Sequence, residues 1–172
     1  GPKSAWAHWA LGRTAYYRHE MGIFRTEADR IIELAPNDSF MLAAAGHTLA
    51  YSGSWELGMS LMARAIELNP HHQTWYHGPY FYDAYRQGLD DDALAAALRL
   101  NMPGFYWPYV LRTAAYGQLG MVDEAAASLA RLHELYPGYS IQTQIDEQRL
   151  WNFEDDMIAR MSDGLRKAGL PE

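Results

Sequence analysis

The stretch Ala65-Ile66-Glu67-Leu68-Asn69-Pro70 recurs in similar form four times along this chain of 172 residues. Each copy is a short apolar run that ends at a proline, and these prolines are Pro36, Pro70, Pro103 and Pro137. They lie 34, 33 and 34 residues apart. A fixed period of this length indicates a repeat array, in which each unit buries its apolar face only against its neighbours.

The period matches that of the tetratricopeptide repeat, a helix–turn–helix unit of about 34 residues. We therefore expect an all-α fold, a right-handed tetratricopeptide-repeat superhelix (α-solenoid) with four helix–turn–helix units and C-terminal capping helices. The four expected units are residues 5–38, 39–72, 73–105 and 106–138, and the expected caps are residues 139–172. Gly1-Pro2 resembles a protease-cleavage scar, so residues 1–4 are expected to be a tag remnant or linker, and the chain a domain of a longer protein.

Local residue choices predict where the helices break and where they cross. Met21-Gly22 is expected to end the first helix, and Gly53 the third, because glycine tolerates the left-handed conformation of a helix stop. Gly78-Pro79 falls early in the first helix of the third unit, which is therefore expected to start late or bend. Small residues that allow the two helices of a unit to cross closely are expected at Gly58, Ala93 and Ala125.

The last helix has the pattern of a terminal cap. Its apolar residues recur every fourth position, at Phe153, Met157, Met161 and Leu165, and Asn152 is expected to be its N-cap. A single apolar stripe with a polar back suits the end of a repeat array, because only one face then needs a neighbour.

Composition and charge exclude several functional classes. The net charge is −7, and no run of Lys or Arg exceeds Arg166-Lys167, so nucleic-acid binding is not expected. No apolar stretch approaches the roughly 20 residues that span a bilayer, so membrane insertion is not expected either. The absence of cysteine excludes disulfides and thiolate metal sites. This absence also fits a reducing compartment.

Four further stretches resemble one bacterial group of tetratricopeptide regions. They are Asn69-Pro70-His71-His72, Trp75-Tyr76-His77, Ala95–Trp107 and Gly164–Glu172. The chain resembles the C-terminal repeat region of proteobacterial class III adenylate/guanylate cyclase-like proteins and of TolB-like or winged-helix regulators. The resemblance implies a regulatory module of a larger cytoplasmic signalling protein, which is itself free to be membrane-associated. The catalytic or DNA-binding part of that protein has no counterpart in these residues.

Candidate binding residues follow from the first helix of each unit, which lines the concave face of such arrays. Reading every fourth residue gives aromatic and cationic rows, and the predicted site residues are Trp9, Arg13, Tyr17, His47, Tyr51, Tyr82 and Arg86. Tyrosine and tryptophan are common at binding hot spots, and arginine holds carboxylates with paired hydrogen bonds. We therefore expect a non-catalytic scaffold that binds a protein or peptide with aromatic and acidic groups, including a segment of its own parent chain. The alternative is that the aromatic residues only pack between helices.

Other functions have weaker support in the sequence. Self-association as a homodimer, or docking on an upstream effector domain, is the alternative function. Its candidate surface is the patch Tyr80, Phe81, Phe105, Tyr106 and Trp107, for which core packing is the favoured interpretation. His71, His72 and His77 lack the spacing of a metal site, so no metal is expected. No phosphate-binding loop or nucleophile motif is present, so we expect no cofactor and no enzymatic activity.

Overall fold

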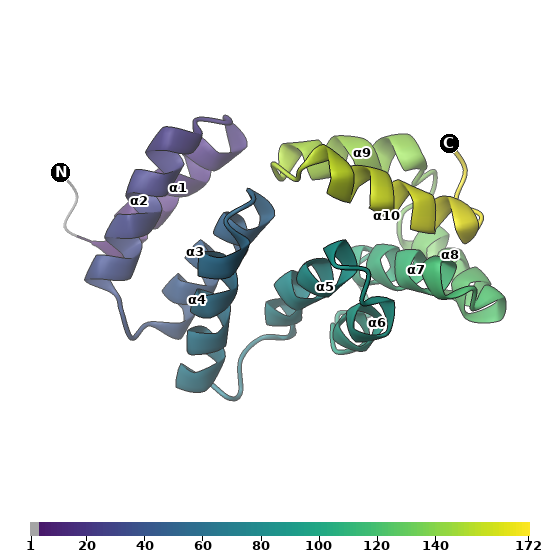
Figure 1. Cartoon of the computed structure of the whole chain (residues 1–172), viewed down its shortest axis with the longest axis horizontal. Helices are drawn as coiled ribbons and strands as arrows, with labels where there is room; N and C mark the ends of the chain where they lie inside the picture. The colour runs from purple at the N-terminus through teal and green to yellow at the C-terminus, as the bar shows by residue number, and fades with distance from the viewer. Residues whose placement is uncertain (1–3) are drawn as a thin grey trace. The chain divides into compact units, whose positions relative to one another are not determined.

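The structure, a computed structural model, describes residues 4–172, which form ten α-helices and one short 3-10 helix and contain no strand (Figure 1). The helices are α1 (Ala5–Tyr17), α2 (Met21–Leu34), α3 (Ser39–Tyr51), α4 (Trp55–Leu68), η1 (Thr74–Tyr76), α5 (His77–Arg86), α6 (Asp90–Leu98), α7 (Trp107–Leu119), α8 (Val122–Leu135), α9 (Ile141–Leu150) and α10 (Asp155–Lys167). The all-α expectation is therefore confirmed. The expected tag remnant or linker lies, apart from Ser4, outside the described residues.

The chain divides into two compact units, which we describe separately. Unit 1 comprises Gly1–Pro79 together with Leu150–Phe153. Unit 2 comprises Tyr80–Arg149 together with Glu154–Glu172. The finer division into four repeats and a cap stays a prediction.

Unit 1 contains two helix hairpins, α1 with α2 and α3 with α4 (Figure 1). The expected break at Met21-Gly22 is wrong, because α2 begins at Met21 and runs through Gly22. The chain turns instead at His19, whose φ of 58° is a left-handed conformation that few residues other than glycine adopt. At the α3–α4 turn Gly53 has a φ of 90°, as expected. Histidine thus occupies in the first hairpin the position that the sequence pattern assigns to glycine.

The two helices of the second hairpin cross at backbone contact. A Cβ atom added to Gly58 would lie 2.6 Å from the carbonyl oxygen of Gly46 and 2.6 Å from the amide nitrogen of Ala50. The expected small residue at this crossing is therefore confirmed. Ala93 and Ala125, the equivalent positions on α6 and α8, are also buried, with 0% and 3% of their surface exposed.

The late start of the first helix in the third expected repeat, residues 73–105, is also confirmed. Residues Thr74–Tyr76 form the 3-10 turn η1, and α5 begins only at His77. Pro79 is then the third residue of α5, where its missing N–H removes no intrahelical hydrogen bond.

Unit 2 is built around buried side chains from α5 to α10. Those that are at most 1% exposed include Phe81, Tyr85, Leu100, Leu111, Leu132, Tyr139, Ile141 and Met161. On α10, Met157 and Leu165 are buried with Met161, as the every-fourth-residue stripe predicts. The expected N-cap is wrong: Glu154 occupies that position, while Asn152 has a left-handed φ of 56° and lies outside the helix.

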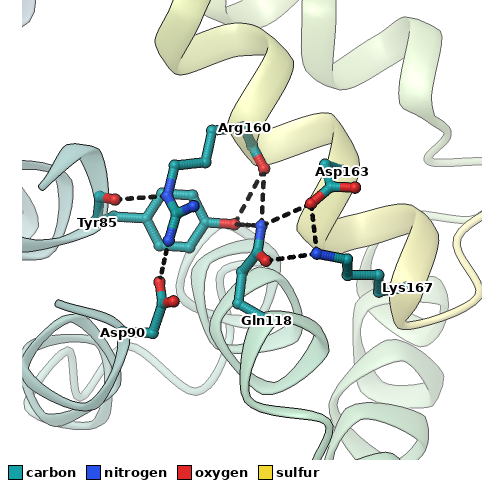
Figure 2. A network of polar contacts seen from close by, with 6 residues as sticks. All are labelled: Tyr85, Asp90, Gln118, Arg160, Asp163 and Lys167. Atoms are coloured by element: carbon teal, nitrogen blue, oxygen red, sulfur yellow. Dashed lines mark hydrogen bonds and ion pairs between the residues drawn. The ribbon is translucent and has the colours of Figure 1, made fainter. Parts of the chain in front are cut away.

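Helices α7 and α10 meet at two glycines and are joined by a polar network (Figure 2). Arg160 donates from Nε to the Tyr85 carbonyl oxygen at 2.6 Å and from Nη2 to Asp90 Oδ1 at 2.6 Å. Gln118 on α7 donates to Asp163 at 3.1 Å and accepts from Lys167 at 2.8 Å. The side chains in Figure 2 converge from α5, α6, α7 and α10, so α10 is held to its unit by both packing and charge.

Candidate functional site

Five of the seven predicted site residues belong to unit 1. Trp9, Arg13 and Tyr17 lie on α1, and His47 and Tyr51 lie on α3. Residues four apart share one helix face, which is why each row stays together. Tyr51 is only 5% exposed, whereas Arg13 is exposed and Trp9, Tyr17 and His47 have intermediate exposure. The rows therefore combine a buried base with an accessible rim.

A small hollow lies between α1, α2 and α3. Its volume is ≈ 20 Å³, which is room for about one water molecule. The polar and aromatic lining consists of Trp9, Arg13, Tyr17, His47, Thr48 and Trp151, and the rest consists of Gly12, Phe24, Ala28, Ile31, Ala44 and Ala45. The hollow is too small for a ligand, but four of the predicted residues, Trp9, Arg13, Tyr17 and His47, line it together.

Arg13 is held between two aromatic rings on its own helix. Its guanidinium carbon lies 5.4 Å from the centre of the Trp9 ring and 5.5 Å from that of Tyr17. Its Nη2 atom also makes a long hydrogen bond of 3.5 Å to the Tyr17 hydroxyl. Among residues 4–172 no carboxylate forms an ion pair with Arg13. Cation–π contacts orient the group without neutralising it, so Arg13 retains its capacity to hold an acid.

His47 contributes a neutral ring to the site. Burial lowers its pKa to about 4, and the positive charge of Arg13 acts in the same direction, while the hydrogen bond to Ala43 opposes both. At neutral pH the Nδ1–H group therefore donates to the Ala43 carbonyl oxygen at 3.1 Å, and Nε2 is an acceptor. For Tyr17, whose charged form is an anion, burial raises the pKa, and Arg13 partly opposes this effect. The only formal charge that these predicted residues add on α1 and α3 at neutral pH is thus that of Arg13.

Sequence reasoning missed two aromatic residues of this surface, Trp75 and Trp151. The Trp75 ring centre lies 5.4 Å from that of His47. The Trp151 ring centre lies 5.4 Å from that of Tyr17 and 5.9 Å from that of His47. Neither tryptophan follows the helical spacing that revealed the other residues, because Trp75 lies in a 3-10 turn and Trp151 in the turn after α9. The one feature of the sequence that could have pointed to these two residues is a large aromatic side chain next to residues that favour turns.

The other two predicted residues, Tyr82 and Arg86, belong to unit 2. Tyr82 is 3% exposed and accepts a hydrogen bond of 3.3 Å from Trp107 Nε1. Burial raises the pKa of its hydroxyl to about 12. Arg86 donates to Asp83 Oδ1 from Nε at 3.0 Å and from Nη2 at 2.7 Å. Tyr82 is therefore a core residue of its unit, and Arg86 already holds a carboxylate. Neither observation tests partner binding, so the predicted part of these two residues in it stays a prediction.

The structure also locates the residues of the other hypotheses. Of the aromatic patch weighed for self-association, Phe81 is fully buried and Phe105 is 42% exposed. His72 and His77 have ring centres 5.2 Å apart, and residues 4–172 contain no group of three His, Cys, Asp or Glu placed to hold a metal. Within the same described range, every helix is too short or too polar to cross a membrane.

Comparison with known proteins finds similarity in structure alone. No protein-family model matches the chain, and no curated protein matches it. A crystal structure of the MamA protein superposes with a TM-score of 0.62 at 15% sequence identity, and the match covers 95% of this chain and 91% of that one. The MamA RS-1 ArsTM double mutant gives a TM-score of 0.64 at 15% identity, with 98% and 95% covered. The fold class is thus all-α and of tetratricopeptide type, while the resemblance to cyclase-like and TolB-like regulators gains no support.

Proposed function

We propose that this chain is a non-catalytic scaffold that binds a protein or peptide on the rim that the accessible side chains of α1 and α3 form in unit 1. The observation that carries the proposal is Arg13, an exposed guanidinium stacked between Trp9 and Tyr17 without an acid of its own. A fold of the tetratricopeptide type suits this role, because its helices present side chains on an extended surface.

The chemistry of the rim specifies the partner. Arg13 binds a carboxylate through charge-assisted hydrogen bonds, which are roughly twice as strong as neutral ones. Trp9 and the aromatic neighbours of His47 offer large, rigid contact area for an aromatic side chain. His47 Nε2 accepts one hydrogen bond from the partner. The expected ligand is therefore an extended peptide in which an acid lies close to an aromatic residue.

On this proposal the chain is the regulatory interaction part of a larger bacterial signalling protein. That part of the proposal is based only on the four stretches that resemble such regulators. It places the partner, or the docked segment of the parent chain, in the cytoplasm.

A displayed library of random peptides, selected on the wild-type chain, tests the proposal. We expect the selected peptides to be rich in Asp or Glu next to Trp, Tyr or Phe. Substitution Arg13→Ala is expected to weaken their binding about 10- to 100-fold, because a hydrogen bond to a charged group contributes about 1.5–3 kcal/mol.

Arg25→Ala is the matched control, because Arg25 is also an exposed arginine of unit 1 but lies on α2 and lines no part of the hollow. Its binding is expected to equal that of the wild type. If Arg13→Ala retains its helical circular dichroism and binds the selected peptides as tightly as Arg25→Ala, the proposed site is wrong.

A further inference from the structure

The binding surface of unit 1 already holds an aromatic side chain, and it comes from the far end of the sequence. Residues Leu150–Phe153, the turn between α9 and α10, belong to unit 1. Trp151 lines the hollow, and its ring centre is 5.4 Å from Tyr17, 5.9 Å from His47 and 6.0 Å from Tyr51. Most of these contacts are edge-to-face, the geometry that aromatic pairs favour.

Two hydrogen bonds to Tyr16 fix this turn. The Tyr16 hydroxyl donates to the carbonyl oxygen of Trp151, and the Asn152 side-chain amide donates to the carbonyl oxygen of Tyr16 at 2.9 Å. Phe153 follows with its ring centre 4.5 Å from that of Tyr51. Unit 1 thus contacts the turn through its aromatic rings, through the carbonyl oxygen of Trp151 and through the amide of Asn152. A bound peptide makes contacts of the same kinds.

Three features favour displacement of this turn by a ligand. Trp151 has only intermediate burial, unlike the fully buried Tyr16 beneath it, and Leu150 is 49% exposed. Asn152 adopts a φ of 56°, a left-handed conformation that asparagine tolerates better than other non-glycine residues but less well than glycine. The turn also leaves Arg13 without an acid, so it satisfies the aromatic part of the site and not its charged part. A ligand that supplies both an aromatic ring and an acid therefore binds this surface more tightly than the turn does.

We propose that Trp151 is an internal, displaceable occupant of the unit 1 surface, and that the partner replaces it with its own aromatic side chain next to an acid. This inference rests on the proposed function and specifies its ligand. The chain's own sequence fits the description, since Trp151 and Phe153 precede Glu154, Asp155 and Asp156. In the folded chain the three acids occupy the N-cap and first turn of α10, whereas in a free peptide they are available to Arg13.

A labelled peptide of residues 149–156 is the probe, and fluorescence anisotropy measures its binding to the full chain. Substitution Trp151→Ala vacates the surface and is expected to bind the peptide at least about tenfold more tightly than the wild type, because a site that is mostly occupied internally loses affinity in proportion to its free fraction. Leu98→Ala is the control, an exposed apolar residue of unit 2 that lines no part of the hollow, and it is expected to behave as wild type. A peptide with Ala in place of Trp is expected not to bind.

Asn152→Ala provides a second variant that keeps Trp151 and removes the hydrogen bond to Tyr16. Its affinity for the peptide is expected to lie between those of the wild type and Trp151→Ala, and it decides the matter if Trp151→Ala fails to fold. Equal affinity of the wild type and both variants overturns the inference, as does absence of binding to a variant with wild-type circular dichroism. Library peptides that bind in an Arg13-dependent manner while the probe fails leave the proposed function standing and reject this inference alone.

Discussion

Substitution Gly117→Ala tests the α7–α10 packing that organises unit 2. A Cβ atom at this position would lie 1.9 Å from the carbonyl oxygen of Gly164 and 3.1 Å from the amide nitrogen of Ala168. Real Cβ contacts are essentially never shorter than 3.0 Å, and both neighbours are backbone atoms that cannot rotate away. The two helices must therefore move apart by about an ångström along this contact, and Met161 and Leu165 on α10 lose packing with them.

The magnitude follows from two opposing effects. Overpacking of a filled core costs about 1–3 kcal/mol and occasionally more, and the rigid backbone contact at Gly117 favours the upper end. Alanine is the better helix former by about 1 kcal/mol, which offsets part of that loss. We expect the free energy of unfolding to fall by about 2 kcal/mol. For a chain of this length that corresponds to a decrease of about 4–8 °C in Tm.

Two glycines serve as controls for this measurement. Gly22 is helical and Gly104 lies in a loop, and a Cβ at either would meet no atom within 4 Å. Gly22→Ala is expected to be neutral or to stabilise by up to about 1 kcal/mol, and Gly104→Ala to change stability by less than about 0.5 kcal/mol. Urea unfolding followed by circular dichroism measures all three. If Gly117→Ala is as stable as the wild type, the backbones of α7 and α10 do not touch and the reasoning fails.

Three further measurements test the charges and the register. Arg160→Gln removes partly buried charged hydrogen bonds and is expected to lower the free energy of unfolding by about 1.5–3 kcal/mol. Arg30→Gln, which removes an exposed ion pair with Glu33, is expected to lower it by less than about 0.5 kcal/mol. Equal losses in urea unfolding would contradict the network of Figure 2. Burial depresses the pKa of His47 to about 4 from 6.5, so the unfolded chain binds the proton more readily and stability falls as pH drops from 6.5 towards 4, by up to about 3 kcal/mol. His47→Gln is expected to remove that part of the pH dependence, and an unchanged profile would refute the lowered pKa of His47. Ala65→Leu, at a fully buried site, is expected to cost about 1–3 kcal/mol in a thermal melt, whereas the exposed Ala63→Leu on the same helix is not, and equal melts would refute the register.

The local features of this protein could be predicted from the amino-acid sequence. The prolines mark the ends of helix pairs, and Gly58 marks a close crossing, because a helical repeat imposes the same spacing on each unit. Trp9, Arg13 and Tyr17 could be placed together because residues four apart share a helix face. Such patterns extend over one or two turns, and they are readable from the chain alone.

Only the tertiary structure decided which distant residues meet. The contact of Trp151 with Tyr17 joins residues more than a hundred positions apart, and no periodicity links a turn to a helix face. The pair Gly117 and Gly164 is equally invisible, since each glycine alone resembles a weak point in its helix. Helical spacing determines which face a side chain occupies, whereas packing of the folded units determines what that face touches. The sequence therefore predicts the rows of the proposed binding surface, whereas only the fold shows that Trp151 lies against them.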